Sequence, residues 1–280
     1  MRRLLLAVFL ACAASLAGAE NRPPNVDEAD VRAAIRDVAS PDFEVRETAA
    51  KKLSAWGSDA VPQLFAALEQ KPDPELVARF GSVKTVYASC VQPVNGLSLS
   101  LKADRARVEA GALFEVTLVL RNETDQPLAV FLGMEARLPH PHRKMLRAVR
   151  WPLGRGPELV GAGLPDPVPN RVQPPAPPAP VFVTLAAREE RALPAKGTVW
   201  FRGSEAAKAA FEAPADTKGA FQFLADAAGR LELQAVLALK QETFAAWKSY
   251  AVVKQLAAPV WLGDLRSERL VLEIVQPAAK

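Results

Sequence analysis

The sequence contains few of the residues that usually carry catalysis or covalent crosslinks. It has two cysteines and two histidines among 280 residues. Cys12 lies in an N-terminal apolar run, so loss of that run leaves Cys90 as the only thiol and excludes an internal disulfide. Both histidines lie in His140-Pro141-His142. A Ser-His-Asp triad would have to use one of them, and the sequence has no G-x-S-x-G nucleophile elbow.

Other chemical signatures are missing as well. The sequence has no H-E-x-x-H zinc helix, no Walker lysine loop and no G-x-G-x-x-G dinucleotide fingerprint. Acidic residues are numerous, but no spacing singles out a pair for general acid-base work. We therefore expect no catalytic residues and no cofactor, with an unrecognised hydrolase kept as the second alternative function.

The sequence has one long apolar run, from Leu4 to Leu16. It follows two arginines and precedes Ala17-Gly18-Ala19, whose small residues suit a signal peptidase. The run is shorter than the roughly 20 apolar residues that span a bilayer. We expect a cleaved secretory signal over residues 1–19 and a periplasmic or secreted mature protein that begins near Glu20.

A second interpretation of the same segment is a lipid anchor. Phe9-Leu10-Ala11-Cys12 resembles the lipobox of bacterial lipoproteins, in which the cysteine is lipidated and becomes the first mature residue. This resemblance implies a tether through Cys12 and no change of fold. The chain has Phe9 where that family usually has leucine, and the apolar run continues past Cys12, so we favour cleavage near Glu20.

The overall composition is that of an ordinary globular protein. Half of the residues are hydrophobic and 24% are charged. Loss of Arg2 and Arg3 with the signal lowers the formal charge from +4 to +2, so the net charge says little about partners. The 24 prolines are unevenly distributed, and this distribution indicates the domain organisation.

Residues 26–88 carry four amphipathic helical stripes. Each stripe has apolar residues about one helical turn apart, as on the buried face of a helix. The stripes are Val31, Ala34, Ile35 and Val38; Val45, Ala49, Leu53 and Trp56; Val61, Leu64, Phe65 and Leu68; and Leu76, Phe80, Val83 and Tyr87. Ser40 before Pro41 predicts the start of the second helix, and Gly57 predicts its end.

These residues resemble a known family. The stretch SPDFEVRETAAKKL from Ser40 to Leu53, followed by Gly57 and Ala60-Val61-Pro62, is similar to the HEAT-type helical repeat of exported bacterial proteins. The resemblance covers about residues 27–88 and implies a protein-contact scaffold without catalytic residues. Solenoids generally need three or more repeats, and this chain has two helical pairs. We therefore expect the open end of the helical unit to pack against the rest of the chain or a partner. A plain four-helix cap on the next domain is the alternative.

The hydrophobic period changes from near four to two over residues 95–276. Leu97, Leu99 and Leu101 alternate with polar residues, and the same pattern recurs from Phe114 to Leu120 and from Leu231 to Leu239. The segment from Val108 to Val130 resembles the opening of bacterial immunoglobulin-like domains. We therefore expect an α+β multidomain chain, with a short HEAT-like unit followed by an antiparallel immunoglobulin-like β-sandwich that has a proline-rich insertion at residues 154–180.

The methionines and histidines beyond the signal lie close together. They are Met134, His140, His142 and Met145. Thioether and imidazole groups suit Cu(I), so the alternative function is a periplasmic copper-binding carrier. The surrounding arginines oppose a cation. The simpler interpretation makes Met134 and Met145 core residues of two strands joined by the His-Pro-His loop. Metal analysis of the purified protein distinguishes these readings.

Basic side chains crowd the same part of the chain. Between Arg137 and Arg155 there are six of them and no acid, with Trp151 among them. Phosphorylated lipid headgroups or acidic glycans could bind such a patch, and a solvated strand edge protected by charge is the alternative. The patch consists of Arg137, Arg143, Lys144, Arg147 and Arg150.

The sequence thus predicts an exported, non-catalytic interaction or scaffold protein of the cell envelope. We expect its partner to be another envelope or extracellular protein, with an anionic envelope surface as a further class and no nucleic acid.

The first testable prediction concerns export. N-terminal sequencing of protein recovered from its host is expected to begin near Glu20, because the small residues at Ala17 and Ala19 place the cleavage site there. A lipidated Cys12 as the first residue would move the protein to the anchored class. Protein that retains Met1 in the cytosol would contradict export altogether.

Overall fold

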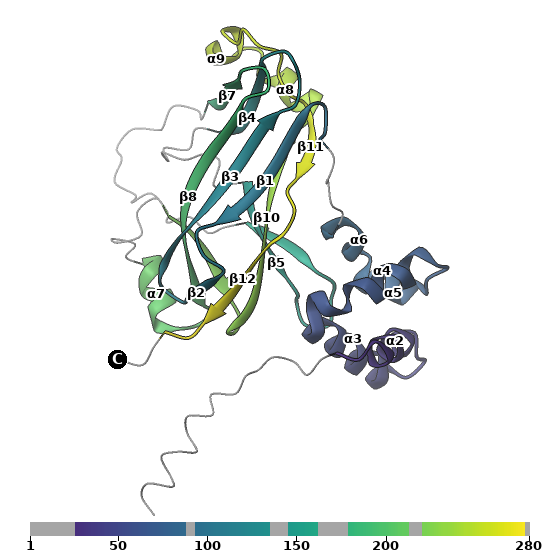
Figure 1. Cartoon of the computed structure of the whole chain (residues 1–280). Coiled ribbons are helices and arrows are strands. Elements are labelled where there is room, and N and C mark those ends of the chain that lie inside the picture. Colours follow the sequence, from purple (N-terminus) through teal and green to yellow (C-terminus); the bar gives the residue numbers. More distant parts are fainter. Residues whose placement is uncertain (1–25, 88–92, 135–144, 162–178, 213–219, 278–280) are drawn as a thin grey trace, which may run out of the picture.

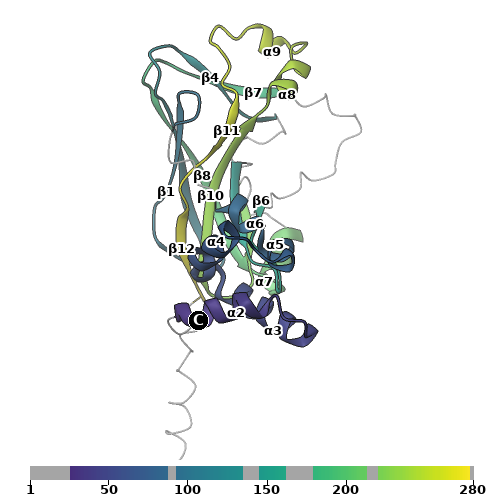
Figure 2. The same cartoon turned by 90° about the vertical axis from the view of Figure 1, so that its right-hand side faces the viewer.

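The computed structural model describes residues 26–87, 93–134, 145–161, 179–212 and 220–277. The first range is helical and the other ranges build a β body (Figure 1). Figures 1 and 2 place the helical unit beside one end of this body. Two short helices, α8 (Gln241–Ala246) and α9 (Ala251–Lys254), lie at the opposite end.

The helical unit consists of short helices with well-defined caps. They are α2 (Glu28–Asp37), α3 (Phe43–Trp56), the 3-10 turn η2 (Gly57–Ala60), α4 (Val61–Glu69), α5 (Pro74–Phe80) and α6 (Ser82–Val86). Asp27, Asp42 and Asp73 each accept a backbone N–H with the side chain at the start of a helix. The expected cap at Ser40 is wrong by two residues, because Asp42 takes that role and Ser40 accepts the Asp42 N–H.

Two glycines shape the ends of these helices. Gly57 has a φ of 55° and donates its N–H to the Leu53 carbonyl, which ends α3 as the sequence predicted. The fourth predicted stripe is divided at Gly81 into α5 and α6. A Cβ at Gly81 would lie 2.5 Å from the Val77 carbonyl oxygen, so only glycine fits this tight junction.

The helical unit has its own apolar core. Ten of its twelve buried members belong to the four predicted stripes, whereas Ala50 and Ala60 do not, and the stripe residue Val45 is exposed. The buried members are Val31, Ala34, Val38, Ala49, Ala50, Leu53, Ala60, Leu64, Leu68, Leu76, Phe80 and Val83. Trp151, from the β body, packs against this cluster. The helical core is therefore completed by a side chain that the unit does not supply.

The strands of the β body form three sheets. The first has the order β1 (Leu97–Ala103), β3 (Leu113–Asn122), β8 (Glu190–Phe201), β9 (Phe221–Ala225). The second has the order β2 (Arg107–Glu109), β12 (Leu270–Val275), β10 (Gly229–Leu239), β5 (Leu146–Arg150), β6 (Glu158–Gly161), with β11 (Gly263–Arg266) also beside β10. The third pairs β4 (Leu128–Met134) with β7 (Pro180–Leu185).

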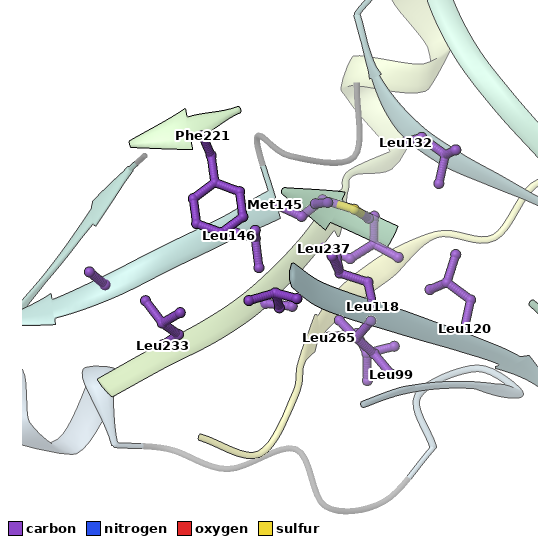
Figure 3. Close-up of a cluster of buried hydrophobic side chains, with 14 of the residues drawn as sticks. Leu99, Leu118, Leu120, Leu132, Met145, Leu146, Phe221, Leu233, Leu237 and Leu265 are labelled. Carbon is purple, nitrogen blue, oxygen red and sulfur yellow. The ribbon is translucent and has the colours of Figure 1, made fainter. Parts of the chain in front are cut away.

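One continuous core joins the three sheets. Figure 3 shows leucines from each of them meeting in the same cluster, together with Met145 and Phe221. Leu99, Leu118 and Leu120 come from the first sheet, Leu146, Leu233, Leu237 and Leu265 from the second, and Leu132 from the third. Burial of each such side chain contributes about 1.5–3 kcal/mol. This shared core makes the β body one unit.

The predicted fold class is wrong. The expected chain had one short helical unit followed by an antiparallel immunoglobulin-like sandwich. The structure is instead a mixed arrangement of α-helices and β-strands with three sheets, in which β2 pairs β12 in parallel and β8 pairs β9 in parallel. The helix α7 (Glu205–Glu212) connects β8 and β9. Alternating hydrophobicity shows which face of a strand is buried, but it does not show which strand lies next to it or in which direction. The sequence pattern therefore could not predict the strand pairing.

Part of the predicted proline-rich insertion is regular structure. The β6 strand lies inside residues 154–180, and Pro180 opens β7. Residues 162–178, including the stretch expected to form polyproline II, lie outside the described residues. Among the helices that are described, none has the length and apolar character required to cross a membrane.

The shared packing leads to a prediction about fragments. Residues 20–90 expressed alone should lack a cooperative thermal transition, because a single core is marginal at about 60 residues and the fragment loses Trp151 from its core. Residues 95–280 should retain β structure, because their core is contributed by the sheets. Circular dichroism melting of both fragments tests this. A cooperative melt of the helical fragment at the temperature of the intact protein would show that it folds independently.

Candidate functional site

The junction between the helical unit and the β body is centred on Tyr87, directly after α6. The Tyr87 hydroxyl donates to Oε2 of Glu232 on β10 at 3.0 Å. Nε1 of Trp151, which follows β5, donates to the same hydroxyl at 3.3 Å. The Arg269 guanidinium carbon lies 3.8 Å from the centre of the Tyr87 ring, a cation-π distance. Tyr87 therefore joins three segments of the β body.

Glu232 is the buried charge in this junction. Its side chain is 5% exposed. Nε of Arg230 lies 3.0 Å from Oε1, and Nε of Arg269 lies 3.8 Å from Oε2. A buried carboxylate is costly unless it is paired and hydrogen-bonded. The two guanidiniums form ion pairs with it, and the Tyr87 hydroxyl, from the helical unit, donates the hydrogen bond to Oε2. Oε1 has no hydrogen-bond partner among the described residues.

The environment of Tyr87 keeps its hydroxyl protonated. Burial raises the pKa of Tyr87 strongly above its usual value of 10.0, and the negative charge of Glu232 raises it further. The hydroxyl therefore remains a hydrogen-bond donor throughout the physiological pH range.

Further polar contacts cross the same junction. Ser54 on α3 donates its hydroxyl to the Arg155 carbonyl at 2.9 Å, and the Gly156 N–H donates to the Arg79 carbonyl at 2.7 Å. Arg266 donates Nη1 to the Thr85 carbonyl at 2.6 Å. A Cβ at Gly156 would lie 2.5 Å from the Ser82 Oγ, so the backbone approaches the helices too closely for a side chain. The helical unit is thus bound at several points along its length.

A pocket opens beside this junction because two strands separate. The β5–β10 ladder ends at the Leu233–Ala148 pair, although β10 continues to Gly229 and β5 to Arg150. The pocket has a volume of about 320 Å³ and lies between the two strands, the end of α3 and the turn between β9 and β10. Its polar and aromatic lining residues are Ser54, Trp56, Ser58, Arg150, Trp151, Asp226, Arg230 and Glu232.

Some charges around this pocket have close partners, since Arg202 donates to Asp226 at 2.7 Å and Arg230 lies 3.0 Å from Glu232. Other pairs are looser. Arg150 lies 3.8 Å from both Glu158 and Asp226. Arg230 lies 3.7 Å from Asp59 on η2. These distances are too long for direct hydrogen bonds but short enough for attraction. Among the described residues, no acceptor forms a hydrogen bond with Nε of Arg150.

The structure describes two of the four predicted metal ligands. Met134 ends β4, where it is paired with Pro180, and Met145 is buried in the core of the β body beside Leu146. His140 and His142 lie outside the described residues. Within the described ranges, no group of three or more histidine, cysteine or acidic side chains could hold a metal ion. The copper site therefore stays a prediction.

The predicted basic patch is described only in part. Arg137, Arg143 and Lys144 lie outside the described residues, as does Cys90. Arg147 lies in β5, where Nη1 would be 2.7 Å from a Cβ placed on Gly161 of β6, and Arg150 faces the two acids named above. The patch as an anionic-partner site also stays a prediction.

Sequence reasoning missed the junction residues. Tyr87 and Glu232 are 145 positions apart, and no local pattern links them. Glu232 is a single acid within the apolar alternation of β10, on the face opposite Leu231 and Leu233. The available sequence signal was an acidic residue inside an apolar strand pattern. The pattern does not show whether that residue is buried.

Comparisons with known proteins give little further guidance. No family model matches the chain, and no curated protein matches it. A solved structure of the Pseudomonas fluorescens alkylpurine DNA glycosylase AlkC, bound to DNA containing an abasic site analogue, is similar over 82% of this chain and 61% of that chain, with 10% sequence identity and a TM-score of 0.25. This chain thus spans less than two thirds of the glycosylase chain.

The expectation about partners requires correction. The sequence-based exclusion of nucleic acid is contradicted by this DNA-bound neighbour and does not stand. At a TM-score of 0.25, the likeness carries no argument that this chain binds DNA or acts on it.

The junction gives a prediction for stability. Tyr87→Phe is expected to lower the free energy of unfolding by about 1–3 kcal/mol, because a hydrogen bond to a buried carboxylate is lost. The raised pKa adds a pH dependence. Stability from this group is complete below the ordinary tyrosine pKa of 10.0 and is lost as pH rises above it, because the unfolded tyrosine releases its proton first.

Urea denaturation between about pH 7 and 11 measures both effects. The variant should show a smaller alkaline loss of stability than the wild type. Tyr250→Phe is the matched control, because Tyr250 is the other tyrosine of the chain and lies beside α9. Equal alkaline slopes for the wild type and Tyr87→Phe would contradict the assigned role of the hydroxyl.

Proposed function

We propose that this chain is an exported, non-catalytic interaction protein of the cell envelope, and that its helical unit makes the contacts. Support comes from the exposed surface of α2 and α3. Phe43 and Val45, in the first turn of α3, have 63% and 39% of their surface exposed. Exposed apolar side chains that gather beside a hollow are typical of binding surfaces.

A groove between α2 and α3 adjoins these side chains. It has a volume of about 480 Å³ and includes Val45, Ala49 and Trp56 among its lining. Asp30, Asp37 and Glu44 surround it, with Lys52 as the basic residue of the lining. An apolar floor with an acidic rim fits a partner that presents an apolar side chain next to basic ones.

The junction supports the same proposal. A binding scaffold is most effective when its surface is held in place before the partner arrives, because less conformational entropy is then lost on binding. Tyr87, Ser54 and the Arg79 carbonyl tie the unit to the β body at separate points. Without the β body, the apolar core of the helical unit would end at an open surface, as expected for a helical stack of two pairs.

Site-specific photo-crosslinking tests this proposal. A photoreactive phenylalanine analogue at Val45 is expected to form a defined adduct in the native host, because this position faces the groove. The same analogue at Val271 is the matched control. Val271 lies on β12, far from α3 in sequence, is also a valine, and is 42% exposed.

The adduct at Val45 should disappear when Glu44 and Asp37 are both changed to lysine, because the rim then repels a basic partner. Nuclease treatment before analysis shows whether an adduct contains nucleic acid. Equal labelling at both positions, or no defined adduct at Val45, would contradict a contact surface on the helical unit.

A further inference from the structure

We propose that the pocket between β5, β10 and the end of α3 binds a neutral saccharide, one or two sugar rings in size. This site is separate from the helical groove and goes beyond the contact function proposed above. The balance of charge in the pocket, its aromatic wall and its size favour such a ligand.

The charged lining residues are balanced. Two guanidiniums, of Arg150 and Arg230, face two carboxylates, of Asp226 and Glu232. An anionic ligand would be repelled by the carboxylates, and a cationic one by the guanidiniums. A neutral ligand avoids both penalties and can still bind the accessible charged groups, because guanidiniums donate hydrogen bonds and carboxylates accept them.

The spacing of these groups suits hydroxyl groups. Arg150 Nε and Asp226 Oδ2 are 3.8 Å apart, while the other carboxylate oxygen of Asp226, Oδ1, accepts a hydrogen bond from Arg202 at 2.7 Å. A hydroxyl between such a pair can accept from the guanidinium and donate to the carboxylate, so it completes an interaction that is too long when direct. Ser54 and Ser58 add hydroxyls to the opposite wall. A sugar ring offers adjacent hydroxyls in this arrangement.

The aromatic side chains give the pocket an apolar wall. Trp56 and Trp151 both line it. Gly57 packs against the Trp151 indole, since a Cβ there would lie 3.5 Å from Cδ1, and this contact helps to fix the ring beside the pocket. The negative face of an indole attracts the C–H groups on the apolar face of a sugar. The volume of about 320 Å³ lies at the lower end of the range for small-molecule sites.

The pocket remains accessible. The side chains of Arg150, Arg230 and Asp226 are 37%, 51% and 58% exposed. Glu232 is instead buried at its base and held by Tyr87. A ligand would thus contact the three accessible charged groups at the rim and leave the junction intact.

Binding of neutral disaccharides to the purified full chain tests the proposal. Cellobiose, maltose and di-N-acetylchitobiose serve as probes, followed by saturation-transfer NMR and calorimetry. At least one is expected to bind with a Kd of about 1 mM or lower. Arg150→Gln and Asp226→Asn should each weaken binding about tenfold or more, because each removes a charged hydrogen-bond partner.

Matched controls come from an exposed ion pair elsewhere. Arg188 and Asp125 are 2.9 Å apart, connect a loop after β3 to one after β7, and do not line the pocket. Arg188→Gln and Asp125→Asn should leave the affinity unchanged. Thermal melting of all four variants identifies any that fail to fold, and the second pocket variant then decides the result.

Three outcomes would overturn the proposal. The first is that none of the three probes binds. The second is binding that the pocket variants and the control variants weaken equally, which places the sugar elsewhere. The third is that glucuronate binds and neutral sugars do not, because the pocket would then select an anion.

Discussion

The arrangement of this protein depends on a buried carboxylate that the β body cannot fully accommodate by itself. Glu232 lies on β10 with 5% of its side chain exposed, next to Arg230 and Arg269. Its remaining partner is the hydroxyl of Tyr87, which belongs to the helical unit. Without the helices, Glu232 would lose a hydrogen bond and the surface that keeps water from it. Undocking would leave the buried Glu232 carboxylate with fewer partners. The free-energy cost of that loss favours one orientation of the helical unit and the β body.

The same contacts determine where the exposed surfaces lie. Ser54, near the end of α3, is tied to the Arg155 carbonyl, so α3 has a fixed direction relative to β5. This direction leaves the first turn of α3 pointing away from the β body, with Phe43 and Val45 exposed, and places the last turn beside the pocket. One helix therefore contributes to two separate candidate sites, and its contacts with the β body fix its position before a partner binds.

The sequence predicted the local features of the fold better than the long-range ones. Apolar spacing identified the inward faces of the helices, including Leu53, Leu64 and Phe80, because a helix repeats every few residues. Alternation likewise found β1, β3 and β10. It could not show that β2 pairs in parallel with β12, since that contact joins strands more than 150 positions apart. The helix start was displaced because Ser40 and Asp42 are both good caps, and only the backbone path selects Asp42.

The candidate sites were less predictable for the same reason. Arg150 was singled out as one member of a basic cluster, but its acidic neighbours Glu158 and Asp226 come from other strands and turns, and they change its surroundings from basic to balanced. Tyr87 was identified only as the last member of an apolar helical stripe, and its polar role depends on Glu232, which is 145 positions away. Charge complementarity of this kind is a property of tertiary structure and leaves no local periodicity.

The separation of β5 from β10 places the pocket directly beside the junction. Beyond Ala148, β5 no longer pairs with β10, and the chain instead carries Trp151 and Gly156 toward the helices. Beyond the point of separation β5 pairs with β6 and β10 pairs with β12, and the Gly156 N–H donates to the Arg79 carbonyl of the helical unit. A ligand in the gap would touch α3 and both strands at once. Because it could bind fully only when the helical unit is docked, its binding would stabilise the docked state by mass action, and docking would in turn strengthen its binding.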